Sequence, residues 1–260
     1  TATTGNIIDT GVLTISGTST FTTSQSNDDI TLGSVNVFTG AVALNTSGST
    51  GDALVDNGTT ALDIAASTVG GDLTLISGAA AGITDSGTVT VTAGNLAVTT
   101  NANSGVIDMD SIVVAASSGW VSLTTHGTGD ATVSETGRLT FGTSTVGGNL
   151  IATSTTGNIV QQSGTGLTIT GTSAFTTSTN NRDILLSNTS NAFTGALTIT
   201  TNDSAGNTRA YARIDGGTTA LIIATSTIDG NLTLISGAAL GITDSGNVTV
   251  AGNLVATTNA

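Results

Sequence analysis

The chain has 260 residues, with no Cys, no Pro and no Lys, and its 17 acidic residues against four Arg give a formal net charge of −13. Charged residues make up only 8% of the chain and mean hydropathy is +0.30, which together exclude a disordered polyelectrolyte. The lack of a basic patch excludes nucleic acid and anionic membrane surfaces as partners, and the lack of Cys excludes thiol chemistry.

Short segments in which apolar and small polar residues alternate follow one another along the chain, each bounded by Gly, Ser, Asn or Asp. We call these segments words. Alternation of apolar and small polar residues is typical of a strand with one buried face, so in GDLTLIS we expect Leu73 and Leu75 to be buried and Thr74 to face outward. In chain order, strands are predicted within LTISGTSTFTT (13–23), DDITL (28–32), VFTGAV (37–42), GDLTLIS (71–77), AGITDSG (81–87), TVTV (88–91) and GNLAVTT (94–100).

The same words return later in the chain. Residues 59–91 and 218–250 differ at seven of 33 positions, and LTISGTSTFTT at Leu13 returns as LTITGTSAFTT at Leu167, an offset of 154 that drifts to 159 between the two longer stretches. A weaker copy lies at half this distance, since STVGGDL at Ser67 returns as STVGGNL at Ser144. Repeats of short strands predict an architecture in which equivalent residues stack on one another.

A β-solenoid satisfies these constraints. The 23 residues from Leu73 to Leu96 hold about three words, and one coil of three short strands buries its apolar face only against neighbouring coils. The prediction is an all-β, right-handed parallel β-helix with coils of about 20–23 residues and about 12 coils. An immunoglobulin-like array would repeat a core Trp, but Trp120 is not repeated, and a propeller would need aromatic blade motifs that are missing.

The domain prediction is one repeat segment over residues 1–260, in which 1–102 resembles 153–260. Residues 103–143 form a degenerate stretch that carries the only Met, Trp, His and Glu of the chain. The sequence opens and closes within the pattern, so we expect it to be a fragment of a much longer chain. It contains no apolar run of about 18 residues, so no transmembrane helix is expected, and its first residues lack the features of a signal peptide.

Acidic residues and the single histidine are the obvious candidates for chemistry. Asp28 and Asp29 form a carboxylate pair, but the repeat replaces the first of them with Arg182. His126 has no orienting partner nearby in the sequence, and Asp85 recurs as Asp244 in a turn word, which favours a capping role. The sequence therefore predicts no catalytic residue, no cofactor site and no metal site.

Three minor alternatives remain open. Asp108 and Asp110 could contribute to a surface Ca²⁺ site. Words of the form Thr-x-Thr, such as the one from Thr88 to Thr90, occur on ice-binding solenoids, although here they are scattered over all faces. The stretch 201–217 (TNDSAGNTRAYARIDGG) is longer than its counterpart, and Arg and Tyr are favoured contact residues. We predict a partner surface there and in the degenerate stretch, formed by Arg209, Tyr211, Arg213 and Trp120.

The words GNLTLISGAA (230–239), ITDSGTVTV (83–91) and LTITGTSAFTT (167–177) resemble the repeats of giant secreted bacterial β-helix proteins, the filamentous haemagglutinin-like adhesins and large autotransporter passengers. The resemblance covers nearly the whole chain. It implies a β-helical rod on the cell surface or outside the cell, exported through an outer-membrane pore, with roles in adhesion, aggregation or cell–cell contact.

The predicted function is therefore a non-catalytic structural segment of an extracellular adhesin. Its expected partners are other copies of itself, a host or neighbouring cell surface, or a glycan, with no nucleic acid and no membrane insertion. A self-assembling fibre or sheath subunit is one alternative. A carbohydrate-active or carbohydrate-binding β-helix is the other, and it would require Asp28, Asp29, His126 and Arg138 to gather on one face.

Overall fold

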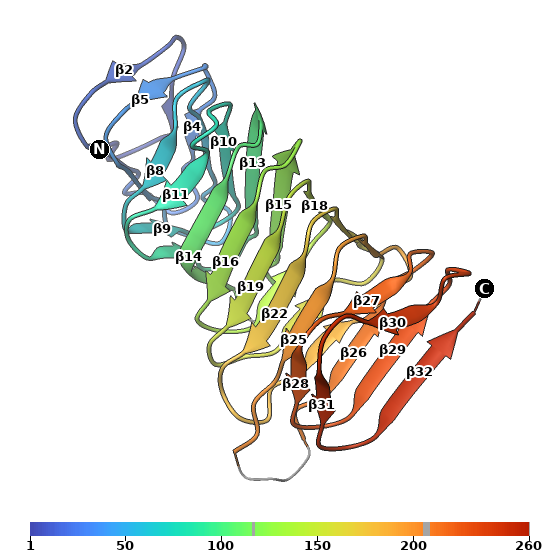
Figure 1. Ribbon diagram of the computed structural model, residues 1–260. Coiled ribbons are helices and arrows are strands. Elements are labelled where there is room, and N and C mark those ends of the chain that lie inside the picture. The colour runs from blue at the N-terminus through green and yellow to red at the C-terminus, as the bar shows by residue number, and fades with distance from the viewer. Residues whose placement is uncertain (116–117, 205–208, 260) are drawn as a thin grey trace. The chain divides into compact units, whose positions relative to one another are not determined.

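The computed structural model describes residues 1–115, 118–204 and 209–259, and its regular elements there are all β-strands. The chain divides into two compact units, unit 1 (Thr1–Val133) and unit 2 (Ser134–Ala260). Within each unit, parallel strands of successive coils lie side by side (Figure 1). The predicted parallel β-solenoid is confirmed, with about 11 coils in the described residues where about 12 were predicted.

Unit 1 contains these strands: β1 (Ile7–Ile8), β2 (Thr14–Ile15), β3 (Ser19–Thr22), β4 (Ile30–Leu32), β5 (Val37–Phe38), β6 (Val42–Asn45), β7 (Ala53–Asp56), β8 (Leu62–Ile64), β9 (Ser67–Val69), β10 (Leu73–Ser77), β11 (Ile83–Asp85), β12 (Val89–Val91), β13 (Leu96–Asn103), β14 (Ile107–Val114) and β15 (Val121–His126). One sheet has the order β1-β4-β7-β10-β13-β15, a second contains β3, β6, β8, β9, β11, β12 and β14, and β2 pairs with β5. β16 (Ala131–Glu135) contains the boundary between the units.

Unit 2 contains these strands: β17 (Leu139–Phe141), β18 (Ser144–Val146), β19 (Leu150–Ser154), β20 (Ile159–Gln161), β21 (Leu167–Ile169), β22 (Ser173–Thr177), β23 (Ile184–Leu186), β24 (Ala192–Phe193), β25 (Leu197–Thr200), β26 (Ala212–Asp215), β27 (Leu221–Ile223), β28 (Ser226–Ile228), β29 (Leu232–Ser236), β30 (Ile242–Asp244), β31 (Val248–Val250) and β32 (Leu254–Thr258). One sheet path has the order β17-β20-β23-β26-β29-β32, β18 continues to β21 and β24, and the facing sheet contains β19, β22, β25, β27, β28, β30 and β31.

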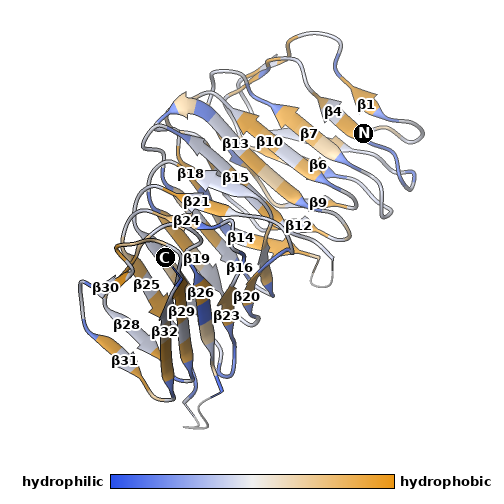
Figure 2. Ribbon diagram, turned by 90° about the vertical axis from the view of Figure 1, so that its right-hand side faces the viewer, coloured by the Kyte–Doolittle hydropathy of each residue, from blue (hydrophilic) through white to orange (hydrophobic). Residues whose placement is uncertain are grey.

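The core of each unit consists of aliphatic columns that run from coil to coil. In unit 1, Leu75 lies between Val55 and Val98 of the neighbouring strands. Leu75 and Val55 are completely buried, and Val98 is 1% exposed. Burying such a side chain stabilises the fold by about 1.5–3 kcal/mol. Figure 2 shows the apolar residues recurring along the strands, for example in β10 and β13. The alternation predicted for Leu73, Thr74 and Leu75 is confirmed, because β10 has the burial pattern buried, half-buried, buried.

The phenylalanines recur with the long repeat, Phe21 with Phe175 and Phe38 with Phe193, which predicts core positions, and the structure stacks them in the core. Phe38, Phe141, Phe175 and Phe193 are buried, and Phe21 is half-buried at the edge of Phe38. Phe175 meets Phe141 and Phe193 edge to face, with ring centroids 6.3 and 6.0 Å apart. Aromatic pairs in this geometry contribute about 0.5–1.5 kcal/mol beyond their buried area.

The length of a coil varies more than the predicted 20–23 residues. Strand register places Ala53 opposite Leu73, 20 residues away, but Ile184 opposite Ala212, 28 residues away. The added length does not disturb the sheet, because Ile184, Leu185 and Leu186 pair in register with Ala212, Arg213 and Ile214. Most coils contain three strands, whereas β13 and β14 are continuous strands of eight residues each.

Copies of one word do not always occupy the same sheet. STVGGNLIATS (144–154) forms β18 and β19, and its relative STIDGNLTLIS (226–236) forms β28 and β29. β19 pairs with β22, whereas β29 belongs to the sheet that contains β26 and β23. The two words thus enter the two sheets of unit 2 in opposite order, because β18 and β29 belong to one sheet and β19 and β28 to the other.

Candidate functional site

One residue in each coil of unit 1 immediately precedes the first strand, and these residues form what we call the corner column of unit 1: Asn6, Asp29, Asp52, Asp72, Asn95 and Trp120. Each Asn or Asp in it caps the next coil. Asp29 Oδ1 accepts the backbone N–H of Asp52 at 2.9 Å, and Asp52 Oδ1 accepts that of Asp72 at 2.7 Å. Asn95 Oδ1 accepts the N–H of Trp120 at 3.2 Å, so the column ends at an aromatic residue.

Three neighbouring members of this corner column carry carboxylates, which we call the acidic column: Asp29, Asp52 and Asp72. Their main chains are one strand spacing apart, about 4.8 Å. A shallow groove of about 290 Å³ runs between them and the outward residues of β4, β7 and β10, such as Thr31 and Thr74. No group of three or more His, Cys, Asp or Glu in the described residues is arranged to hold a metal ion. The groove therefore offers stacked negative charge to a partner.

Unit 2 has the equivalent corner column: Arg138, Asn158, Asp183, Tyr211, Asn231 and Asn253. Asn158 Oδ1 accepts the N–H of Asp183 at 3.0 Å, and Asp183 Oδ1 accepts the N–H of Tyr211 at 2.8 Å. Capping resumes at Asn231, which accepts the N–H of Asn253 at 2.8 Å. Tyr211 thus occupies in unit 2 the kind of position that Trp120 occupies in unit 1.

The structure places three of the four predicted partner residues together. Tyr211 is 41% exposed, and Arg213 points outward from β26, where it lies between Leu185 and Thr233 of the adjacent strands. Arg209 is exposed just before them, although part of the long stretch in which we predicted this surface, residues 205–208, lies outside the described residues. Trp120 is half-buried and belongs to unit 1.

Charge is distributed unequally between the units. All four arginines lie in unit 2, whereas unit 1 contains 11 of the 17 acids: Asp9, Asp28, Asp29, Asp52, Asp56, Asp63, Asp72, Asp85, Asp108, Asp110 and Asp130. Formal charges are therefore −11 for unit 1 and, from six acids and four arginines, −2 for unit 2. The uneven distribution of charge is present in the sequence, but the boundary between the units is needed to assign the charges to two separate compact units.

The candidates for catalysis do not converge. Asp28 is 9% exposed and its Oδ2 has no hydrogen-bond partner among the described residues, whereas Asp29 belongs to the acidic column. His126 is the last residue of β15, at the opposite end of that sheet's strands, and its Nδ1 lies 2.7 Å from the carbonyl oxygen of Thr100. Arg138 belongs to unit 2. Asp29 and His126, which both belong to unit 1, therefore lie at opposite ends of the strands of one sheet.

Asp85 caps a neighbouring coil rather than its own turn. Its two carboxylate oxygens accept the backbone N–H groups of Asp110 at 2.9 Å and Ser111 at 3.1 Å. Burial raises the pKa of Asp85 above its ordinary value of 3.8, and the charge of Asp110 adds to the rise, while the hydrogen bonds oppose it. The repeat equivalent Asp244 is exposed. This arrangement supports β14 and does not indicate acid–base chemistry.

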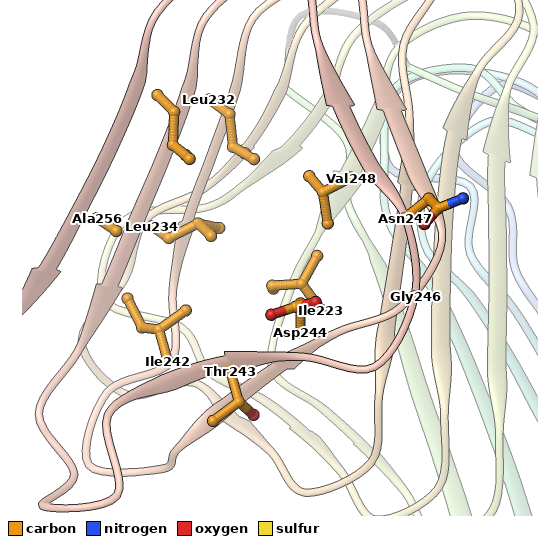
Figure 3. A pocket seen from close by; sticks show the side chains of 11 residues that line it. Ile223, Leu232, Leu234, Ile242, Thr243, Asp244, Gly246, Asn247, Val248 and Ala256 are labelled. Atoms are coloured by element: carbon orange, nitrogen blue, oxygen red, sulfur yellow. The ribbon is translucent and has the colours of Figure 1, made fainter.

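A hollow of about 360 Å³ lies at the last coil of unit 2, beside β30, β31 and the exposed strand β32 (Figure 3). Its walls are Ile223, Leu232, Leu234, Ile242, Val248 and their neighbours, which belong to the same aliphatic columns that fill the core elsewhere. Thr243, Asp244 and Asn247 also line it, at the turn that connects β30 to β31.

Comparison with known proteins identifies one family. The family model described as "Repeats of unknown function (DUF5649)" matches residues 1–45, 50–112 and 128–200. No curated protein and no solved structure matches the chain. In the described residues there is no helix long and apolar enough to cross a membrane.

Proposed function

Because the chain belongs to the family of repeats of unknown function (DUF5649), we propose that it is a non-catalytic structural segment of a secreted or cell-surface bacterial β-helical adhesin. One observation carries the proposal: the Asn and Asp side chains before each coil are used to cap the next coil, as from Asp29 to Asp52 to Asp72. These polar side chains are used for hydrogen bonds between successive coils, which is a structural role. The proposed role is to provide length and stiffness for adhesion, aggregation or cell–cell contact.

The aromatic residues give further support to this proposal over a carbohydrate-binding one. Sugar recognition commonly uses exposed aromatic faces, but Phe38, Phe141, Phe175 and Phe193 are buried in the core. The remaining aromatic residues are Phe21 and Trp120, which are half-buried, and Tyr211, which is exposed.

The proposal is tested in the full-length parent protein on its own cells. Deleting residues 13–166 removes one long period of 154 residues and joins the chain where LTISGTSTFTT and LTITGTSAFTT correspond, so strand register is kept. A structural role predicts weaker cell aggregation or shorter surface filaments after this deletion. The variant His126→Ala with Arg138→Ala is the control, because it removes two residues of the carbohydrate-active alternative and leaves every aspartate in place, and it should aggregate as the natural protein does. Normal aggregation after the deletion, or loss of activity in the control, would overturn the proposal.

A further inference from the structure

Unit 2 presents a cationic surface that unit 1 lacks. We define the arginine patch as Arg182, Arg209, Tyr211 and Arg213. All four side chains are exposed, and the three guanidinium groups make no ion pair with any residue that the structure describes. The patch spans two adjacent coils, because Asp183, which follows Arg182, hydrogen-bonds the N–H of Tyr211 at 2.8 Å. Leu185 and Val255 lie on the same outward row as Arg213 and add apolar area.

We propose that the arginine patch binds the acidic column of a second copy of this chain, an inference that rests on the proposed structural function. Charge complementarity selects this occupant. The acidic column presents Asp29, Asp52 and Asp72 on three successive coils, in the unit that has no arginine. Their Oδ1 atoms are used for capping, and each carboxylate also has an Oδ2 atom that can accept from a guanidinium group.

The two surfaces also match in spacing. Both lie at the corner column, so along each the main chains of successive coils are about 4.8 Å apart. Guanidinium groups from two coils of unit 2 can therefore meet carboxylates from two coils of unit 1 in register. Because the two surfaces are different, the contact is heterologous, and repeating it adds copies to an open assembly unless a ring closes. Tyr211 at the centre provides the rigid amphipathic contact that such interfaces favour.

Ionic strength should affect the contact in two directions. Each copy carries a net charge of −13, so copies repel one another at very low salt. At about 0.1 M salt the Debye length is about 10 Å, which screens distant charges more than contacting pairs, and at 1 M it is about 3 Å. Association should be strongest near 0.1 M and lost near 1 M.

The experiment is sedimentation velocity of the natural chain and matched variants at about 0.1 M salt. Arg213→Glu should weaken self-association by about tenfold or more, because it replaces attraction with repulsion. Arg138→Glu makes the same charge change elsewhere in unit 2 and should have a much smaller effect. A variant with Asp29→Asn, Asp52→Asn and Asp72→Asn keeps a capping oxygen at each position and should weaken self-association at least as much as Arg213→Glu does.

Mixing the two interface variants provides the decisive observation. The triple Asn variant retains the arginine patch, and Arg213→Glu retains the acidic column, so an equimolar mixture has one intact pairing and should form heterodimers that do not grow. The proposal is overturned if the natural chain is monomeric at every salt concentration, if Arg138→Glu weakens association as much as Arg213→Glu, or if the mixture stays monomeric. The deletion of residues 13–166 also removes the acidic column, so the filament length of that variant, rather than its aggregation, tests the proposed structural function independently of this contact.

Discussion

The side-chain amide of Asn57 replaces a strand, and removing it should destabilise unit 1. β5 pairs with β2 on one side, and on the other side the main chain of Phe38 is bound by Asn57, which is completely buried. Asn57 Oδ1 accepts the Phe38 N–H at 2.7 Å, and its Nδ2 donates to the carbonyl oxygens of Phe38 at 3.0 Å and Ala61 at 2.8 Å. The variant Asn57→Ala leaves these buried groups without their partner.

The expected loss follows from the number of buried groups left unsatisfied. Each costs about 1–3 kcal/mol, and partial relaxation or an entering water reduces the sum, so we expect Asn57→Ala to lower the free energy of unfolding by about 3 kcal/mol. Asn95→Ala is the matched control. It also removes one amide that caps a main-chain N–H, but Asn95 lies at the partly exposed corner, where water can replace it, and it should cost about 0.5–1 kcal/mol.

Urea unfolding followed by tryptophan fluorescence measures this directly, because Trp120 is the only tryptophan and it lies in unit 1. Equal midpoint shifts for Asn57→Ala and Asn95→Ala, or a loss below about 1 kcal/mol for Asn57→Ala, would show that the buried amide does not act as the missing strand.

Three further predictions concern the capping, corner and core residues. Because the pKa of Asp85 is raised, its protonation stabilises the fold at low pH, and this contribution is lost as pH rises from 3.8 through the raised pKa. In urea titrations, the free energy of unfolding of the natural chain relative to that of Asp85→Asn should therefore fall over that pH window. The fall should be smaller when Asp110→Asn is also present. Gly82→Ala, at a φ of +72° and with a carbonyl oxygen of the next coil in the way, should lower the melting temperature by several degrees, whereas Gly11→Ala, with open space around it, should not. Phe175→Ala should cost about 3–5 kcal/mol in unfolding experiments on unit 2, and a loss below about 1 kcal/mol would contradict its place between two other rings.

Part of the candidate site was visible in the sequence. Words such as GDL and GNL place Asp72 and Asn95 immediately before a strand, and the recurrence of that position predicts a column. The members that break the pattern were not identified in this way. Trp120 and Tyr211 were singled out as possible contact residues, but that each occupies a corner column follows only from strand register.

The sequence by itself determined the fold class, because alternation at period two defines which residues are buried and near-identical words must stack. It also determined the core, including Leu73, Leu75 and the phenylalanines. These properties are local: each depends on a few residues and on the fact that equivalent side chains lie above one another.

The tertiary structure decided which sheet each word enters. STVGGNLIATS and STIDGNLTLIS are identical at six of eleven positions, yet β19 and β29 lie in different sheets of unit 2. The reason is physical: the position of a strand around the axis depends on the summed lengths of the coils before it, and these vary from 20 to 28 residues. Residues added at a corner lengthen the coil but leave the alternation within its strands unchanged. The alternation alone therefore cannot specify which sheet a strand enters. The separation of charge between the acidic column and the arginine patch depends on the same register.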